Sequence, residues 1–358
     1  MNGDSFPSVS QVGLSRRRFV LALPLLGALP YLAHPSRALA MSSTPGLERA
    51  SSVLMGTRVD IAVPVGQGMD ASIARGAMER AFSEMRRLEG LMSRYRDDSD
   101  VARIGAAAGQ HPVRVAPQVM SVLQQAQRLY RDSGGMFDVT VGALRGWHFE
   151  AERHEVPATA EIKRELALVN AGDLHLDANA GTAYLARPGM RLDLGGIAKL
   201  PILQAGLQEI ERAGVADALV NGGGDVLTMG SQHGRPWRVG IRDPLNPSQL
   251  FGVAELEGRA VVASSGDYER GFMHEGRLLH HVLDPRTGWP TQGVHGVALL
   301  ARGIEEVNGW GAALMVRGPT AAPEWYARHP PVELMVAGAD GKRWLSPGMI
   351  TALRPGTA

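Results

Sequence analysis

The sequence predicts an α+β fold, with mixed or antiparallel sheets packed against helices. Helical periodicity recurs in several separate segments, whereas short apolar strands and glycine turns alternate through much of the C-terminal half. Mixed order with many hairpins favours α+β over a doubly wound parallel sheet. The 358 residues, 44% of them hydrophobic, are enough for a large core in one big domain or two closely joined ones.

Each expected element follows from a local pattern. The pattern of residues 52–63 predicts a single strand that ends at Pro64 and Gly66. Apolar residues recur at helical spacing over residues 73–92 and again over about 116–132, where Ser133-Gly134-Gly135 stops the helix. Further along we expect a helix at about 159–168, a hairpin of Leu174–Asp177 and Thr182–Ala186, a helix at about 196–213, a strand at Ala218-Leu219-Val220 and a helix at about 304–317.

The first 40 residues predict an export signal. Ser15 precedes three arginines, an apolar segment runs from Phe19 to Leu32, and Ala38-Leu39-Ala40 closes the segment. This order is typical of a cleaved signal peptide, and the paired arginines match the twin-arginine signal. A membrane anchor is the alternative, but the apolar segment is short and contains two prolines. We therefore expect a periplasmic domain of residues 41–358 with no membrane span.

Charge and cysteine content exclude several classes of function. Residues 1–40 carry four arginines and one aspartate, so the net charge of +1 for the whole chain becomes −2 for residues 41–358. A mildly acidic chain without a basic stripe argues against nucleic acid as a partner. The sequence contains no cysteine, which excludes disulfides, thiolate zinc sites and a thiol nucleophile.

Five segments contain residue types suited to chemistry. Gly195-Gly196 before a helix exposes backbone N–H groups to a phosphate, and Lys199 adds a positive charge one turn later. An ordinary strand-to-helix turn is the more common reason for such a glycine pair, and a lone histidine such as His281 is more often structural than catalytic. In chain order the segments are Met55-Gly56-Thr57; Met92 to Tyr95; Gly134 to Gly142; Leu192 to Lys199 with Asn221 to Asp225; and Ala263 to Arg270 with His280 to Gly288.

In this order and spacing the segments resemble the FAD:protein FMN transferase (ApbE-like) family, from Met55 to about Gly318. The most specific runs are DLGGIAK from Asp193, SGDY from Ser265 and HVLDPRTG from His281. The resemblance implies an α+β fold that binds FAD. It also implies that, with magnesium, the protein splits the FAD diphosphate, releases AMP and attaches FMN to a threonine or serine of a target redox protein.

The resemblance also implies roles for individual positions. His281 matches the histidine proposed to take the proton of the acceptor hydroxyl, a task that suits an imidazole near its pKa. The positions expected to contact FAD are Met55, Tyr95, Met136, Phe137, Asp138, Asp193, Lys199 and Leu283, the last through its backbone.

The expected metal segment departs from the family pattern. The family typically has an aspartate four residues before a threonine, and often a second aspartate just before it. This chain has Asn308, Gly311 and Ala312 at these positions. Magnesium prefers charged oxygen ligands, so the site loses most of its expected donors. The remaining candidates are the Gly196 backbone carbonyl and the upstream carboxylates of Glu305 and Glu306.

Two hypotheses about function follow. The first is an exported flavin transferase that modifies a periplasm-facing redox protein. The second is a catalytically impaired relative that binds FAD as a flavin carrier or accessory maturation factor. Simple hydrolysis of FAD to FMN and AMP is a third possibility, and it also requires the metal. An FMN adduct on an acceptor protein separates the first hypothesis from the second.

Overall fold

The computed structural model describes residues 40–355 apart from residues 45, 67 and 151. Residues 1–39 of the expected export signal, which covers residues 1–40, lie outside the described residues. No helix in the described part of the chain is long and apolar enough to cross a membrane.

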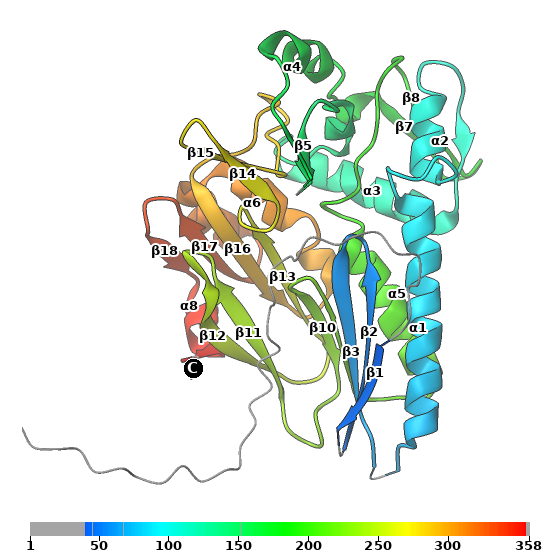
Figure 1. Cartoon of the computed structure of the whole chain (residues 1–358), viewed down its shortest axis with the longest axis vertical. Helices are drawn as coiled ribbons and strands as arrows, with labels where there is room; N and C mark the ends of the chain where they lie inside the picture. The colour runs from blue at the N-terminus through cyan, green and yellow to red at the C-terminus, as the bar shows by residue number, and fades with distance from the viewer. Residues whose placement is uncertain (1–39, 45, 67, 151, 356–358) are drawn as a thin grey trace, which may run out of the picture.

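A nine-stranded sheet forms the centre of the molecule, and every neighbouring pair of its strands is antiparallel (Figure 1). In spatial order the strands are β1 (Ala40–Thr44), β2 (Leu47–Leu54), β3 (Thr57–Pro64), β9 (Ala218–Gly222), β10 (Asp225–Met229), β13 (Ala260–Gly266), β16 (Val294–Ala301), β17 (Glu333–Gly338) and β18 (Arg343–Leu345). The predicted α+β class with antiparallel sheets is confirmed.

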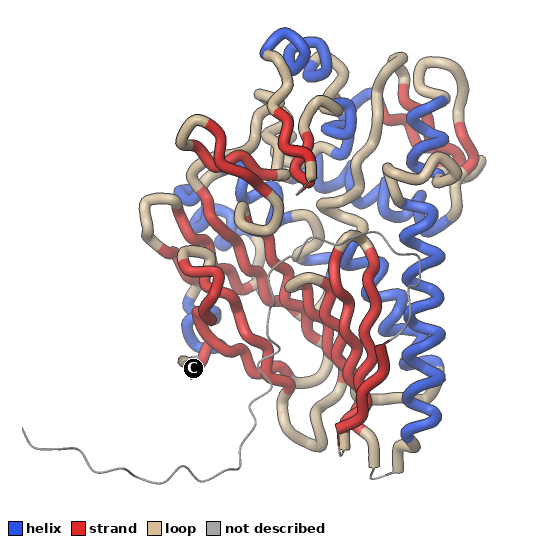
Figure 2. Tube along the Cα trace, viewed as in Figure 1, coloured by secondary structure: helices blue, strands red, loops and turns tan. Residues whose placement is uncertain are grey.

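The longest helices cover one face of this sheet. Figure 2 shows α1 (Ala71–Met92) running along the sheet, and α5 (Lys199–Arg212) packs against it. The other helices are α2 (Asp100–Ala106), α3 (Pro117–Asp132), α4 (Thr159–Leu166), α6 (Trp310–Arg317), α7 (Ala322–Arg328) and α8 (Pro347–Ala352), with short 3-10 turns η1 (Val139–Ala143), η2 (Ala171–Asp173), η3 (Ile304–Glu306) and η4 (Pro319–Ala321).

Four smaller sheets complete the fold. One contains β11 (Trp237–Asp243), β12 (Asn246–Leu256) and β19 (Leu353–Arg354); another contains β4 (Val113–Arg114), β8 (Thr182–Leu185) and β7 (Leu174–Asp177); the last two are the hairpins β5–β6 (His148–Glu150, Arg153–Glu155) and β14–β15 (Gly271–His274, Arg277–His280). In Figure 1, β5, β7, β8, β14 and β15 lie at the upper end of the molecule, beyond the nine-stranded sheet.

Alternation along the strands divides the core into two layers. Ile61 and Val63 of β3 join the cluster packed against the helices, whereas Ala62 packs on the opposite face with β11 and β12. Successive strand residues point to opposite faces, so a strand buried on both sides is apolar at every position. β10 is buried on both faces, because all five of its residues are buried, but two of them, Asp225 and Thr228, are polar.

Two predicted elements were wrong. Residues 52–63 form a hairpin instead of one strand, because Met55 and Gly56 adopt φ values of 54° and 69° and reverse the chain. The expected helix at 304–317 is interrupted, since Gly309 has φ 78° and separates η3 from α6. The helices expected at 73–92, 116–132, 159–168 and 196–213 and the hairpin at 174–186 are confirmed within a few residues.

Candidate active site

The β2–β3 turn lies at the upper end of its two strands in Figure 1 and carries Met55. A left-handed conformation costs a non-glycine residue roughly 1–2 kcal/mol, and the Met55 backbone N–H is held there by a 2.7 Å hydrogen bond to Oε1 of Glu89. The β9–β10 turn approaches it closely, because a Cβ on Gly223 would lie 2.5 Å from Oγ1 of Thr57. Two glycine-containing turns therefore meet at this end of the sheet.

The loop before α5 is tied to the end of α1 by an ion pair. The Arg94 guanidinium donates to Oδ2 of Asp193 at 2.8 Å, and Oδ1 of Asp193 accepts the Gly195 N–H at 2.8 Å. The Asp193 N–H in turn donates to the Val139 carbonyl at 2.7 Å. Tyr95 follows Arg94 and is 68% exposed, with the Arg94 guanidinium 4.9 Å from its ring centre. Asp193 thus orients the glycine pair, and Tyr95 offers a free aromatic surface beside it.

Asp138 is buried, and protein donors form hydrogen bonds to both of its carboxylate oxygens. Its Oδ1 accepts the N–H and the hydroxyl of Thr140 at 2.7 and 2.5 Å, and its Oδ2 accepts the Ala171 N–H at 2.9 Å. Burial raises the pKa of this carboxyl above its usual range. The geometry makes Asp138 the cap of η1 and the link to η2.

Phe137 connects the segments that were expected to hold flavin and metal. A Cβ on Gly196 would lie 3.1 Å from the Phe137 ring and 3.9 Å from the Ala312 side chain, and a Cβ on Gly309 would lie 3.5 Å from the same ring. Met136, the preceding residue, is half-buried against the main core. The glycine pair, Phe137 and the start of α6 are therefore one contiguous group.

Lys199 begins α5 and contacts an acid from the neighbouring sheet turn. Its Nζ lies 3.2 Å from Oδ2 of Asp225, whose Oδ1 accepts the Ser264 N–H at 2.9 Å. Asp225 is 6% exposed. This chain of contacts links α5, β10 and β13, and it fixes the position of the ammonium group.

His281 follows β15 and has a defined tautomer. Its Nδ1 lies 3.2 Å from the Arg270 carbonyl oxygen, which only accepts, so Nδ1 carries the proton and Nε2 keeps a lone pair. Desolvation first, and the Arg270 guanidinium second, lower the pKa of His281 to about 3, and the charge of Lys199 acts in the same direction. A neutral imidazole therefore lies near two positive charges.

The DPRTG segment after His281 is a tight turn. Asp284 accepts the Arg286 N–H at 2.9 Å and pairs with its guanidinium at 2.7 Å, and Trp147 Nε1 donates to the Gly288 carbonyl at 2.9 Å. The Leu283 backbone bridges Pro290, and its side chain packs on the cluster around Trp147.

Comparisons with known proteins show the family of this chain. The model of the ApbE family matches residues 55–336. The chain belongs to the ApbE family. A relative from Klebsiella pneumoniae (strain 342), named FAD:protein FMN transferase, is 36% identical over 67% of this chain and 72% of its own length. A Treponema pallidum protein of the same name is 30% identical over 79% and 83%.

Solved structures of the ApbE family have the same fold. The Thermotoga maritima ApbE protein aligns with a TM-score of 0.76 at 27% identity and covers 88% of this chain and all of its own. The flavin transferase ApbE from Vibrio cholerae aligns with a TM-score of 0.73 at 27% identity, covering 86% of this chain and 99% of its own.

The side chains present do not fit the magnesium expected from the ApbE resemblance. Asn308 turns its amide nitrogen, a donor, toward the Ile197 carbonyl and Gln125 Oε1, both at 2.9 Å. Gly311 and Ala312 supply no side-chain oxygen, and a Cβ on Gly311 would lie 2.4 Å from Ser265 Oγ. Among the described residues, no group of three or more His, Cys, Asp or Glu is arranged to hold a metal ion.

The upstream carboxylates of Glu305 and Glu306 do not replace the missing metal ligands. Oε2 of Glu306 accepts from the backbone of Arg302 and Gly303 at 3.3 and 3.5 Å, and Glu305 is exposed on η3. The carbonyl that faces Asn308 belongs to Ile197, the residue after Gly196.

Sequence reasoning missed three contributors to the site. Gln125 lies on the half-buried side of α3 and carried no signal beyond helical periodicity. Arg94 and Asp225 lay inside the segments singled out from the sequence, but their ion pairs with Asp193 and Lys199 depend on tertiary contacts.

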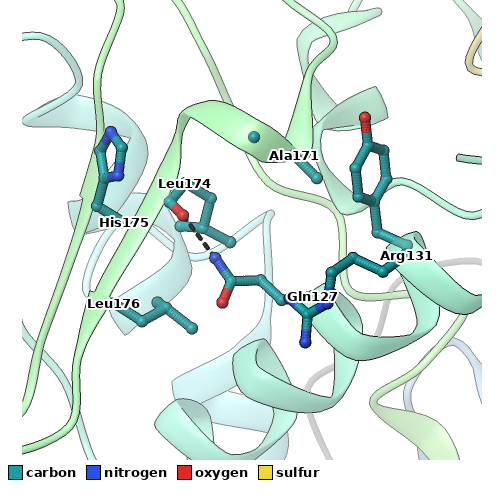
Figure 3. Close-up of a pocket in the computed structure, with 8 residues that line it drawn as sticks. Gln127, Arg131, Ala171, Leu174, His175 and Leu176 are labelled. Atoms are coloured by element: carbon teal, nitrogen blue, oxygen red, sulfur yellow. Dashed lines mark hydrogen bonds between the residues drawn. The ribbon is translucent and has the colours of Figure 1, made fainter.

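A separate cavity of about 480 Å³ lies between α3 and the β7 segment (Figure 3). Gln127 crosses it and donates to the Leu174 carbonyl at 2.6 Å. None of the residues expected to contact FAD lines this cavity.

Proposed function

We propose that this protein is a FAD:protein FMN transferase that acts on a threonine or serine hydroxyl of a redox protein. The observation that carries the proposal is the state of His281: a neutral ring with Nδ1 bound to the Arg270 carbonyl and Nε2 available as a base. The names of the ApbE relatives support the same activity.

The chemistry is a phosphoryl transfer without an oxidation step. The acceptor oxygen attacks the FMN phosphorus of FAD, the bond from that phosphorus to the bridging oxygen breaks, and AMP leaves with that oxygen. His281 Nε2 takes the hydroxyl proton. Lys199 and Arg270 place positive charge near His281, where the negative charge of the diphosphate is stabilised.

A bound diphosphate also changes the pKa of His281, the proposed base. His281 has a pKa of about 3 beside two positive charges, and an adjacent anion favours the protonated ring, so FAD binding raises this pKa. Substrate binding therefore makes the imidazole a stronger base in the complex than in the free protein.

We further propose that the protein is exported by the twin-arginine pathway and acts in the periplasm on a periplasm-facing acceptor. The support is the arginine-rich and apolar N-terminal segment with its A-x-A end. Fusion of residues 1–40 to a reporter, with Arg16 and Arg17 changed to lysine as the control, tests this step. A reporter that reaches the periplasm with both arginines replaced contradicts the proposed pathway.

The transferase test uses the protein without residues 1–40, FAD and an acceptor domain, and the mass of the acceptor is measured. The expected result is a gain equal to one FMN and release of one AMP. The second function, a flavin carrier, is favoured by the Asn308 hydrogen bonds at the expected metal position. Tight FAD binding without any FMN adduct, with and without added divalent cation, identifies the carrier.

A further inference from the structure

Two oxygen atoms converge on one point beside the flavin segments. The Ile197 carbonyl precedes α5 by two residues, and the Gln125 side-chain oxygen comes from α3. Both lie 2.9 Å from the same nitrogen, Nδ2 of Asn308. Converging oxygens repel each other unless a positive centre lies between them.

The Asn308 amide supplies that positive centre. Its NH₂ group carries two protons and donates one to each oxygen. Each oxygen therefore accepts a hydrogen bond, and no ion is needed between them. The orientation of the amide is determined by the Ile197 carbonyl, because a backbone carbonyl cannot donate. Asn308 is 4% exposed, so the two bonds are buried and the arrangement is well defined.

An aspartate at this position would behave in the opposite way. Its oxygen would face the Ile197 and Gln125 oxygens at hydrogen-bond distance with no proton between them, and only a bound cation or a proton would relieve the repulsion. Asparagine has nearly the same shape and removes that requirement.

The positions Gly311 and Ala312 near Asn308 also lack side chains that could hold a cation. Gly311 leaves no space for a carboxylate, because its Cβ would meet Ser265 Oγ at 2.4 Å and Ser265 Cβ at 3.1 Å. Ala312 packs near Gly196 and contributes a methyl group. The space next to Asn308 is therefore filled by neutral groups.

We propose that the Asn308 amide replaces the divalent cation as the bridge between Ile197 and Gln125, so that this protein forms its FAD site without a metal ion. The proposal rests on the proposed function only in taking FAD as the ligand. Asn308 is a positioning residue: it sets the backbone before Lys199 and does not touch the reacting atoms.

The first experiment measures FAD affinity by flavin fluorescence in millimolar magnesium and in EDTA. The expected dissociation constants agree within about twofold, and wild-type protein shows no tight Mn²⁺ site by electron paramagnetic resonance, with or without FAD. A weakening of at least about tenfold in EDTA, the lower end of the loss caused by disturbing a metal's outer-shell partners, or a tight Mn²⁺ site overturns the proposal.

The second experiment compares Asn308→Asp with Asn308→Ala as matched variants. Both lose the two hydrogen bonds, so both melt below wild type in EDTA. Mn²⁺ is expected to raise the melting temperature of Asn308→Asp and to leave that of Asn308→Ala unchanged. Equal responses of the two variants show that the amide does not occupy a cation position, and the proposal fails.

These readouts separate the inference from the proposed function. Cation-independent FAD binding without FMN transfer removes the transferase and leaves the Asn308 inference intact. FMN transfer that depends on magnesium, with cation-dependent FAD affinity, leaves the transferase and removes the inference. If Asn308→Asp does not fold, the wild-type affinity and resonance measurements still decide the question.

Discussion

Individual side chains in this candidate site divide into those that hold the backbone and those that are exposed. Asp138 belongs to the first group, because three protein donors use its carboxylate. Tyr95 belongs to the second, because its ring is 68% exposed and its neighbour Arg94 is engaged with Asp193. The resemblance implied the same role for both residues, and their hydrogen bonds and exposure distinguish them.

Asp138→Asn tests the structural role of this carboxylate. The new amide nitrogen faces the Ala171 N–H, so two donors oppose each other, and we expect a loss of about 1–3 kcal/mol in the free energy of unfolding, measured by urea denaturation. Asp177→Asn is the control, because Oδ1 of Asp177 accepts from Asn179 and Ala180 in an exposed turn and asparagine keeps that acceptor. A stable Asp138→Asn protein that no longer binds FAD contradicts this assignment.

The lowered pKa of His281 predicts how the stability of the fold depends on pH. The folded-state pKa of about 3 lies below the usual value of 6.5. The unfolded chain therefore binds a proton that the folded chain refuses, and stability falls as pH drops from about 6.5 towards 3. Denaturation curves between pH 7 and pH 4 are expected to show a smaller loss for His281→Asn than for wild type. If wild type and His281→Asn lose the same stability over this range, the pKa of His281 is not lowered in the folded state.

The same variant also tests catalysis. Removing a general base typically lowers the rate by about 10²–10⁴-fold, so we expect FMN transfer by His281→Asn to fall by this factor while FAD affinity changes little. Because the free ring is neutral above about pH 3, kcat/KM is expected to show no loss from His281 protonation between pH 8 and 5. A bell-shaped profile with a limb near 6.5 contradicts the lowered pKa of the free protein.

At the scale of elements, the site is made where elements end. Met55 lies between β2 and β3, Lys199 begins α5, and Asn308 lies between η3 and α6. Backbone strain at Met55 and its hydrogen bond to Glu89 on α1 show that the hairpin turn is held by a neighbouring helix. Strain that persists at such a turn points to a function for the side chain.

Met55→Gly separates stability from binding. Glycine tolerates the left-handed turn, so we expect a gain of up to about 1 kcal/mol in stability. The side chain expected to contact FAD is lost, so the dissociation constant for FAD should rise. Met55→Asn is the matched control, since asparagine also tolerates positive φ but retains a side chain. A more stable Met55→Gly protein with unchanged FAD affinity shows that the methionine does not contact the flavin.

The sequence predicted the long amphipathic helices and the strand pairs with polar turns, because their apolar periodicity is a local property. It did not predict the β2–β3 turn, since methionine is uncommon in the left-handed region and gives no turn signal. The break at Gly309 was missed for a different reason: a Cβ there would meet Leu129 at 2.3 Å, a contact between residues distant in sequence. The Asn308–Gln125 bond, which spans 183 positions, depends entirely on the fold.

At the scale of the whole molecule, the candidate site joins segments from almost the full length of the described chain. The four residues Met55, Asp193, His281 and Asn308 reach it from the β2–β3 turn, the loop before α5, the segment after β15 and the segment between η3 and α6. A ligand that contacts several of these segments binds the folded state and not the unfolded one. FAD should therefore stabilise the entire fold.

This makes a prediction for thermal unfolding. FAD at about 100 times its dissociation constant adds about 2.7 kcal/mol, which corresponds to a rise of roughly 4 °C at this chain length, because the entropy of unfolding is about 2.1 cal/mol/K per residue. We expect the same rise in magnesium and in EDTA, and smaller rises with FMN or AMP alone. Scanning calorimetry measures the shift, and the absence of any shift at saturating FAD contradicts the placement of the site.

The antiparallel sheet order has a consequence for how the protein is made. β3 pairs with β9, with Asp60 opposite Asn221, so about 160 residues must be synthesised before the first hairpin gains its partner. At about 5–20 residues per second this interval is on the order of 8–30 seconds. During that time β3 keeps an unpaired edge, which is a template for wrong pairing. The N-terminal segments of the candidate site are therefore made before their C-terminal partners, and the rate of synthesis sets the earliest moment at which the candidate site is complete.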